Sequence, residues 1–196
     1  MADRSAEALF LTAPLHDIGM SRISDSILCK GGPLSSDESA VMRQHCSIGA
    51  RMVRENRQIG SLFLSLGSLL SPSAVASGAS YLTKVAASIA LEHHERWDGN
   101  GYPQGLDGAE TSRESRIAAV ADAFDAMTSN RPYCPAYPEE WALETIYEEA
   151  GSHFDPAVCA AFVKALPQIR SIRRRFADDP SPSPATGAVD RLPVTP

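Results

Sequence analysis

Apolar residues recur at helical spacing along most of this 196-residue sequence. In the stretch 113–129 they lie three and four positions apart, at Ile117, Val120, Ala121, Phe124 and Met127. That spacing places them on one face of an amphipathic helix. No alternating run of apolar and polar residues is long enough to predict a sheet. The sequence therefore predicts an all-α fold, a helical bundle around one core.

Capping signals and periodicity predict where the helices begin and end. Ser35 precedes Glu38 by three residues, a capping box that would start a helix carrying Met42 and His45. Gly19 is expected to close the first helix with left-handed backbone. The turn-rich stretch that follows Trp97 is long enough to indicate a functional loop. The remaining expected helices span about 5–17, 81–96, 113–129 and 138–151, and a last one begins at Asp155–Pro156.

Composition divides the chain into one domain and a tail. With 43% hydrophobic residues, residues 1–176 can bury a single core. Within them, the segment from about 56 to 80 is rich in serine and small residues and is expected to be a loop or a weak helix. It also holds enough leucines to pack on the core or bind a partner. Residues 177–196 are rich in proline and are expected to be disordered.

Several classes of protein are disfavoured by the composition. No run of about eighteen apolar residues predicts a membrane span, and the N-terminus lacks the features of a secretory signal. We therefore expect a cytoplasmic protein. A net charge of −6 speaks against binding a nucleic-acid polymer. The four cysteines show no paired spacing and are expected to be free thiols; they are Cys29, Cys46, Cys134 and Cys159.

Imidazoles and carboxylates gather at the ends and on the faces of the predicted helices. Divalent metals such as manganese, iron and zinc accept these ligands. Neighbouring helical residues point about 100° apart, so each adjacent pair would serve two neighbouring metals better than one. Taken singly, each position has an ordinary explanation as a cap or a surface group, and Asp125 competes with Asp122. Only the combination predicts a metal site, formed by His16, Asp17, His45, His93, His94 and Asp122.

The motifs around these residues resemble those of a known family. In chain order they read "APLHDIGM", "MRQHCSIGARM", "IALEHHERWDGNGYPQGL", "RIAAVADAFDAMTSNRPY" and "GSHFDP". This succession is similar to the HD-GYP family, a branch of the HD superfamily of metal-dependent phosphohydrolases. The resemblance covers about residues 13–163.

The resemblance implies an all-helical phosphodiesterase that hydrolyses the bacterial messenger cyclic di-GMP. It implies two or three divalent metals, usually iron or manganese, bound by the six residues above. His16 and Asp17 would be catalytic, with Asp17 as the bridging carboxylate. Substrate contacts would come from Gly101, Tyr102, Pro103 and Arg131. A diguanylate cyclase (GGDEF) domain is a further partner that the resemblance suggests.

Two residues of the last motif have a simpler explanation. His153 and Asp155 also match the family pattern. Asp155–Pro156 is, however, a favourable start for a helix, with an aspartate cap and a proline in the first turn. We therefore interpret both residues as structural.

The chain departs from the family pattern at four places. No histidine precedes His16, where the family has an earlier ligand-bearing helix, and Met20 and Cys134 replace basic residues. The interval from His45 to His93 is roughly twenty residues longer than in the family. A surface insertion of this length is tolerated because the entropy of loop closure grows slowly with length, but the insertion could also displace His93. These departures leave two alternatives open: a non-catalytic module that binds cyclic di-GMP or a cyclase, and a phosphohydrolase for another nucleotide. The missing helix would expose a face of the bundle, so a homodimer is also expected.

Overall fold

The computed structural model describes residues 4–70, 78–130 and 135–176, and these residues are helical. They form no β-strand and only two isolated bridges, Asp98 with Asp107 and Ala150 with Phe154. The prediction of an all-α fold is therefore confirmed. The elements are α1 (Arg4–Thr12), η1 (Ala13–Leu15), η2 (Ile18–Arg22), α2 (Asp25–Leu28), α3 (Ser36–Met42), α4 (Gln44–Glu55), α5 (Arg57–Leu70), α7 (Ala79–Glu92), η3 (Gly108–Glu110), α8 (Arg113–Thr128), α9 (Glu139–Glu148) and α10 (Pro156–Phe176).

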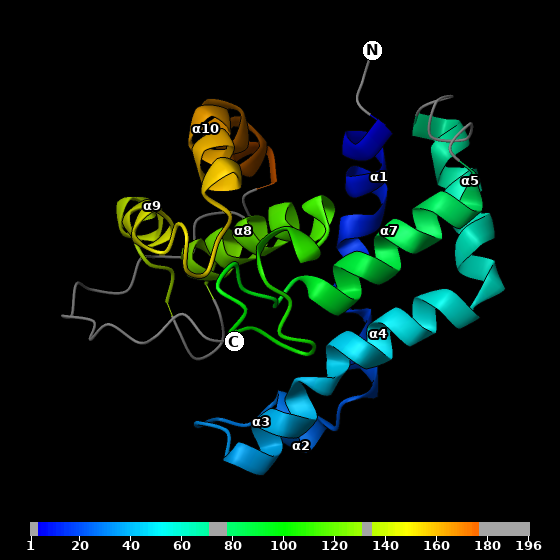
Figure 1. The fold of residues 1–196 in the computed structure, drawn as a ribbon, viewed down its shortest axis with the longest axis horizontal. Coiled ribbons are helices and arrows are strands. Elements are labelled where there is room, and N and C mark those ends of the chain that lie inside the picture. Colours follow the sequence, from blue (N-terminus) through cyan, green and yellow to red (C-terminus); the bar gives the residue numbers. More distant parts are fainter. Residues whose placement is uncertain (1–3, 71–77, 131–134, 177–196) are drawn as a thin grey trace.

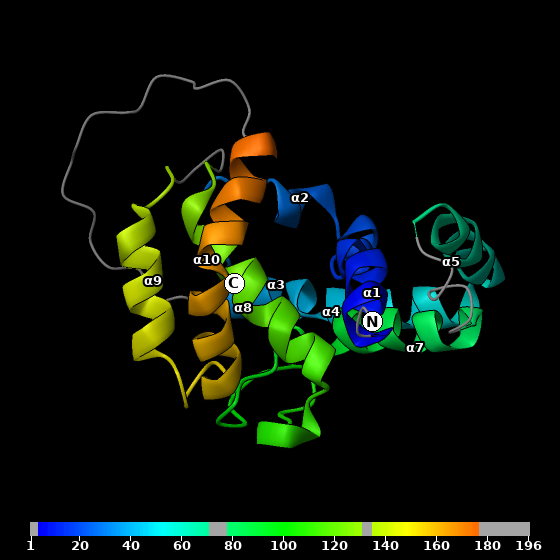
Figure 2. The same cartoon turned by 90° about the horizontal axis from the view of Figure 1, so that it is seen from above.

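The described helices form two groups, each with its own apolar core. Helices α1, α4, α5 and α7 enclose one core, and α8, α9 and α10 enclose the other (Figures 1 and 2). Phe63 and Ile89 are buried in the first core, and Phe124 and Ile146 in the second. Helix α7 also contacts α8, so the C-terminal end of α7 lies where the two groups meet.

The first predicted helix, over residues 5–17, is shorter than expected. Helix α1 ends at Thr12 and the chain tightens into 3₁₀ turns, because Pro14 lacks the amide hydrogen that an α-helix would need. Gly19 does not close a helix, since it lies inside η2 and its φ is not positive. A Cβ atom at this position would come within 2.0 Å of the His45 carbonyl oxygen. Glycine is needed here because η2 packs directly on the backbone of α4.

Two other predicted boundaries shift in ways that matter for the site. The Ser35–Glu38 capping box is present, but the helix that it starts breaks at Arg43, so His45 lies in the first turn of α4. Helix α7 ends at Glu92 instead of residue 96, which places His93 and His94 directly after it. The last predicted start is confirmed, because the Asp155 carboxylate accepts a hydrogen bond from the amide of Ala157.

The segment after Asn56, expected to be a loop or a weak helix, forms helix α5 as far as Leu70. Its side chains at Ile59 and Phe63 are 8% and 1% exposed and pack with residues of α1 and α7. Residues 71–77, and the tail 177–196 that was expected to be disordered, lie outside the described residues. Helix α5 therefore contributes to the core, which is one of the possibilities that the sequence left open for this segment.

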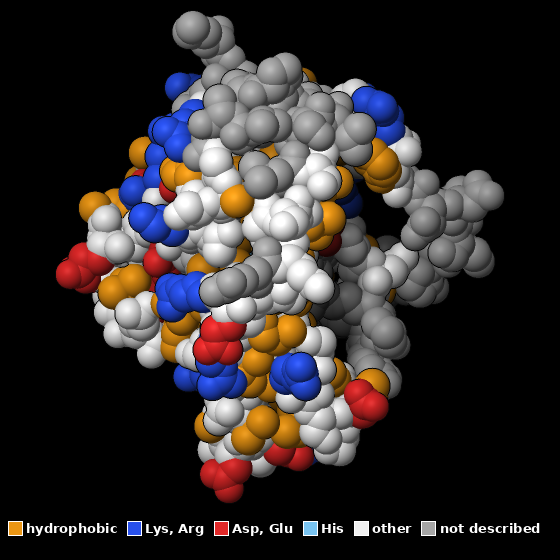
Figure 3. Space-filling model, turned by 90° about the vertical axis from the view of Figure 1, so that its right-hand side faces the viewer, with side chains coloured by type: hydrophobic (Ala, Val, Ile, Leu, Met, Phe, Trp, Pro, Cys, Tyr) orange, Lys and Arg blue, Asp and Glu red, His pale blue; other side chains and the backbone are white. Residues whose placement is uncertain are grey.

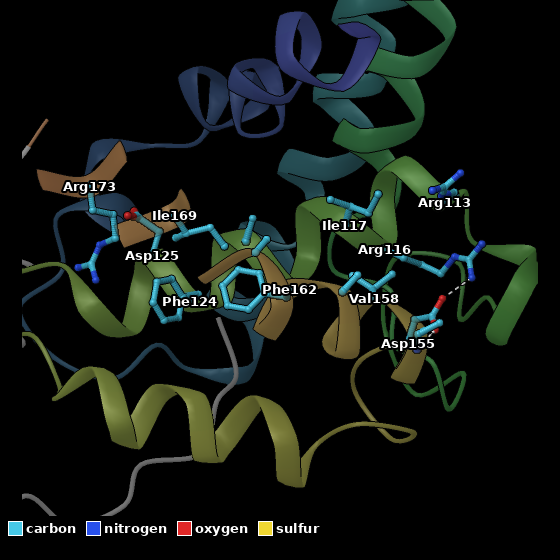
Figure 4. Close-up of a pocket in the computed structure, with 14 residues that line it drawn as sticks. Arg113, Arg116, Ile117, Phe124, Asp125, Asp155, Val158, Phe162, Ile169 and Arg173 are labelled. Carbon is cyan, nitrogen blue, oxygen red and sulfur yellow. Dashed lines mark hydrogen bonds and ion pairs between the residues drawn. The ribbon is translucent and has the colours of Figure 1, made fainter. Parts of the chain in front are cut away.

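A groove with a volume of about 650 Å³ runs between α8 and α10 (Figure 4). Phe124 and Phe162 form its floor, and Arg116 pairs with Asp155 at one end. Ala121, which was predicted to lie in the core, is exposed in this groove. None of the six predicted metal ligands lines the groove.

The outer face of the α5 side has a mixed surface. Figure 3 shows the molecule from the right-hand side of Figure 1, and on this face hydrophobic side chains lie at several places between charged ones. Leu62 of α5 is 49% exposed. Scattered apolar side chains of this kind are normal on a protein surface. In the described part of the chain, no helix combines the length and apolar character needed to cross a membrane.

Candidate metal centre

All six predicted ligands lie together where the two groups of helices meet. They come from four separate segments of the chain. His16 and Asp17 occupy the turn between η1 and η2, and His45 lies in the first turn of α4. His93 and His94 directly follow α7, and Asp122 lies in the middle of α8. The cluster therefore depends on the packing of both groups.

Asp17 is at the centre of this cluster. Its Oδ1 atom lies 3.4 Å from Nε2 of His45 and 3.6 Å from Nε2 of His93. Its Oδ2 atom lies 3.4 Å from Nε2 of His16. The two oxygens of one carboxylate thus face imidazoles from three segments.

Asp122 and His94 complete the cluster on the α8 side. The Oδ1 atom of Asp122 lies 3.7 Å from Nε2 of His16. The ring of His94 lies 4.0 Å from the ring of His93 and 5.2 Å from that of His45, centroid to centroid. Asp125, the competing carboxylate, is exposed and accepts a hydrogen bond from the Ser129 hydroxyl. The structure therefore separates the two carboxylates that the sequence left in competition.

Backbone carbonyls orient three of the imidazoles. Nδ1 of His16 lies 2.9 Å from the Ala13 carbonyl oxygen, and Nδ1 of His45 lies 2.8 Å from that of Met42. His93 makes the same contact with its own helix, at 2.9 Å from the Ile89 oxygen. A carbonyl accepts only from a protonated nitrogen, so each Nδ1 carries the proton. Each Nε2 then faces the cluster, which is the orientation that a metal-binding histidine needs.

The charges in the metal-free cluster compensate one another. The carboxylates of Asp122 and Asp17 raise the pKa of His16 to about 10, against the opposing effect of burial. Burial acts to raise the pKa of Asp17, but its contacts with His16 and His93 outweigh this and hold the pKa well below its usual range. Without metal, His16 therefore carries a proton that a cation would have to displace.

Two other imidazoles are held neutral. Burial, followed by the neighbouring His93, lowers the pKa of His94 to about 3. Burial also lowers the pKa of His45, whose side chain is 3% exposed. Both rings therefore keep an unprotonated nitrogen at neutral pH, as a ligand must.

Cys46 is a member of the cluster that sequence reasoning missed. Its Sγ atom lies 3.4 Å from Nε2 of His45, and it can be grouped with the ligand atoms of His45, His93 and His94 within 4.8 Å. Burial, followed by the charge of Asp17, raises the pKa of this thiol to about 12. The thiol is therefore protonated and a poor ligand. Cys29 and Cys159 are free thiols, as expected, and Cys134 lies outside the described residues.

The loop after α7 places an aromatic ring beside the histidines. The ring of Tyr102 stacks on that of His94, with 4.9 Å between centroids and 27° between planes. The Tyr102 amide donates to the His94 carbonyl oxygen, and the Tyr102–Pro103 peptide bond is cis. A Cβ atom at Gly101 would lie 2.3 Å from the amide nitrogen of Arg96, so only glycine allows the loop to fold back this closely.

A buried carboxylate holds this loop closed. Glu95 is 3% exposed, and its two oxygens accept hydrogen bonds from the amides of Gln104 and Leu106, at 2.7 and 3.0 Å. Sequence reasoning did not assign this residue a role. The available signal was a glutamate placed directly between the paired histidines and a glycine-rich loop, whose free amides need acceptors.

The remaining predicted residues lie elsewhere. Arg131 falls outside the described residues. His153 stacks on Phe154 and its backbone oxygen accepts from the amide of Trp97. Asp155 caps α10 and pairs with Arg116. Both positions agree with the structural interpretation of the last motif.

The donor set fits divalent metal ions. Imidazole nitrogens and carboxylate oxygens converge from four segments, and the orienting contacts to backbone carbonyls are already made. Such a set suits borderline cations such as manganese, iron and zinc. The residues at this junction could therefore hold divalent metal ions.

Comparisons with known proteins agree with this assignment. The HD domain family model matches residues 1–158. A cyclic di-GMP phosphodiesterase from Vibrio cholerae is 39% identical over 172 residues, which cover 88% of this chain and 32% of that protein. One from Thermotoga maritima is 41% identical over 167 residues, which cover 85% of this chain and 39% of that protein.

A relative with a different named substrate is also similar. A 3'3'-cGAMP-specific phosphodiesterase from Vibrio cholerae is 31% identical over 178 residues, covering 91% of this chain and 30% of that protein. This chain therefore spans between 30% and 39% of the length of these three relatives.

A solved structure supports the fold. The crystal structure of a cyclic GMP-AMP specific phosphodiesterase from Vibrio cholerae superposes with a TM-score of 0.55 at 20% identity, over 88% of this chain and 41% of that one. At this identity the likeness concerns the fold alone. With the family match and the curated relatives, the chain belongs to the HD-GYP branch of the HD domain family.

Proposed function

We propose that this chain is a metal-dependent phosphodiesterase that hydrolyses a phosphodiester bond of cyclic di-GMP. The observation that carries the proposal is the position of Asp17, whose two oxygens face the Nε2 atoms of His16, His45 and His93 at 3.4–3.6 Å. The two relatives from Vibrio cholerae and Thermotoga maritima, which are cyclic di-GMP phosphodiesterases, suggest the substrate.

The six clustered residues would bind two or three divalent ions, which we expect to be iron or manganese. When bound, neighbouring metals lower the pKa of water and stabilise charge on the attacking and leaving oxygens of a phosphate. Asp17 would bridge them, and His16 would give up its proton on binding. The contacts with the carbonyls of Ala13 and Met42 would keep His16 and His45 in position.

Tyr102 would bind the substrate phosphate next to this centre. Its ring is held by the stack on His94 and by the loop that Glu95 closes. Burial raises the pKa of the Tyr102 hydroxyl above its ordinary value, so the hydroxyl keeps its proton. A protonated hydroxyl can donate a hydrogen bond to a phosphate oxygen. Gly101, Pro103 and Arg131 remain predicted contacts of the same ligand.

A second substrate is favoured by one comparison. The 3'3'-cGAMP-specific relative matches this chain over 91% of its length. The two dinucleotides differ in one base, so the metal centre would act on both alike, and selectivity would arise from contacts with the bases. A diguanylate cyclase partner and a homodimer remain predictions.

The test is hydrolysis by the purified chain. After reconstitution with manganese, or with iron(II) under anaerobic conditions, we expect cyclic di-GMP to be cleaved, with products separated by chromatography. Asp17→Ala should remove the activity, because it removes the carboxylate that faces three histidines. A parallel reaction with 3'3'-cGAMP measures selectivity.

Two other results would change the assignment. Tight binding of cyclic di-GMP by calorimetry without turnover under any metal condition would indicate the non-catalytic module. Turnover of another nucleotide with neither cyclic dinucleotide cleaved would indicate a different phosphohydrolase.

A further inference from the structure

An arginine lies over the Tyr102 ring. Arg43 occupies the single-residue junction between α3 and α4, two positions before His45. Its guanidinium carbon lies 4.8 Å from the centroid of the Tyr102 ring, which in turn stacks on His94. The Tyr102 ring therefore contacts both the Arg43 guanidinium and a histidine of the cluster.

No carboxylate of the described residues compensates the charge of Arg43. Within the described ranges, no carboxylate lies in salt-bridge distance of its guanidinium, and the side chain is exposed. Two other arginines near the loop differ in this respect. Arg96 pairs with Asp98 at 2.9 Å, and Arg116 pairs with Asp155. Arg43 thus keeps its five donors available beside a candidate phosphate site.

A cyclic dinucleotide needs more than one site for its negative charge. The ring contains two phosphodiester groups, each with one negative charge. Metals held by the histidine cluster would neutralise the phosphate that reacts. The negative charge of the second phosphate would stay uncompensated unless a cation lies beside it. Arginine suits this role because its planar fork donates two parallel hydrogen bonds.

We propose that Arg43 binds the phosphate of the cyclic dinucleotide that is not being hydrolysed. The Tyr102 ring holds the guanidinium in place by a cation–π contact, so that less side-chain freedom is lost when the ligand binds. The proposal rests on the proposed function and adds a specificity contact to it.

The test compares one substrate with two phosphates and one with a single phosphate. For Arg43→Gln we expect the KM for cyclic di-GMP to rise about tenfold, with kcat within about twofold, because a charge-assisted contact to the bound ligand is lost. The kcat/KM for bis(p-nitrophenyl) phosphate should stay at the wild-type value. Arg43→Lys should lie between, since it keeps the charge and loses the fork.

Salt dependence separates ligand binding from a packing role. The wild-type KM for cyclic di-GMP should rise with sodium chloride, and the rise should be weaker in Arg43→Gln. Arg54→Gln is the matched control: Arg54 is exposed at the far end of α4, the helix that Arg43 precedes, and has no ion pair among the described residues. It should behave like the wild type in every measurement.

Two results would overturn the proposal. One is an unchanged KM for cyclic di-GMP in Arg43→Gln. The other is an equal loss of kcat/KM for both substrates, which would mean that Arg43 supports the metal centre or the stability of the fold. If the wild type has no turnover, the proposed function fails. Calorimetry with cyclic di-GMP and the manganese-loaded chain then tests the proposal for Arg43. An approximately tenfold weaker Kd in Arg43→Gln would support it, whereas equal Kd values or no binding by the wild type would overturn it.

Discussion

Nε2 of His45 lies 3.5 Å from Nε2 of His93, although the two residues are 48 positions apart. The long interval between them raised the prospect that His93 is displaced from the cluster. Helices α4 and α7 instead pack directly on each other, and α5 packs beside α7. The extra length therefore forms part of the core that supports both histidines.

The core role of α5 predicts a contrast between two neighbouring residues. Phe63→Ala should lower the free energy of unfolding by about 3–5 kcal/mol, because the side chain is 1% exposed and its loss leaves a cavity. Leu62→Ala should change it by less than about 0.5 kcal/mol, since Leu62 is 49% exposed. Urea denaturation measures both. Similar values for the two variants would show that α5 does not pack on the core as described.

The close approach of η2 to α4 makes Gly19 sensitive to any side chain. In Gly19→Ala, the new Cβ would meet the His45 carbonyl oxygen at 2.0 Å, so the backbone must shift and move Asp17 away from His45. We expect a loss of about 1–3 kcal/mol of stability and weaker manganese binding. Gly32→Ala is the control, because nothing lies within 4 Å of its Cβ. Equal thermal midpoints and manganese affinities for the two variants would refute the close packing.

The loop around Tyr102 should depend on Glu95. Glu95→Gln keeps the size but leaves one of the Gln104 and Leu106 amides without its acceptor, at a cost of about 1–3 kcal/mol. We expect cyclic di-GMP turnover to fall by tenfold or more, while the metal content stays that of the wild type. Glu144→Gln on exposed α9 surface is the control. A metal content that falls in parallel with turnover would mean that Glu95 supports the metal centre instead of the loop.

The protonated His16 of the metal-free chain predicts a pH dependence of stability. Its pKa is raised from 6.5 to about 10, first by Asp122 and then by Asp17, so the folded chain binds this proton more tightly than the unfolded chain. The resulting stabilisation is complete below pH 6.5 and is lost as the pH rises from about 6.5 to about 10. Urea denaturation of the metal-free protein between pH 7 and 10 should show this decline.

A variant and a second ligand test the same proton. His16→Asn should flatten the decline, since it removes the titrating group. Manganese affinity of the wild type should rise over the same pH range, because metal binding releases the proton. A decline that is as steep in His16→Asn as in the wild type would assign the pH dependence to another group.

The features that local sequence determines could be predicted. The spacing of apolar residues identified α8, and the Asp155–Pro156 pair marked the start of α10. The six candidate ligands could be named from their residue types and motifs, and the structure brings them together, while their binding of metal stays a prediction.

Features that depend on contacts between distant segments could not be predicted. Gly19 was expected to end a helix because its closeness to the His45 backbone arises only when η2 packs on α4. Glu95 gains its role from amides nine and eleven positions later, in a loop without periodicity. Arg43 was placed inside a continuous helix, and its contact with the Tyr102 ring arises only when the chain is folded.

The most direct test measures metal content and turnover in the same preparations of Asp122→Asn and Asp125→Asn. The two carboxylates lie three positions apart on α8, but Asp122 is 3.7 Å from His16 and Asp125 is exposed. The wild type and Asp125→Asn should both hold two or three metal ions per chain and hydrolyse cyclic di-GMP at similar rates. Asp122→Asn should hold fewer ions and lose at least about a hundredfold in rate, since metal-centre contacts act mainly on the transition state. Equal metal content and turnover in the two variants would contradict a metal centre at this cluster.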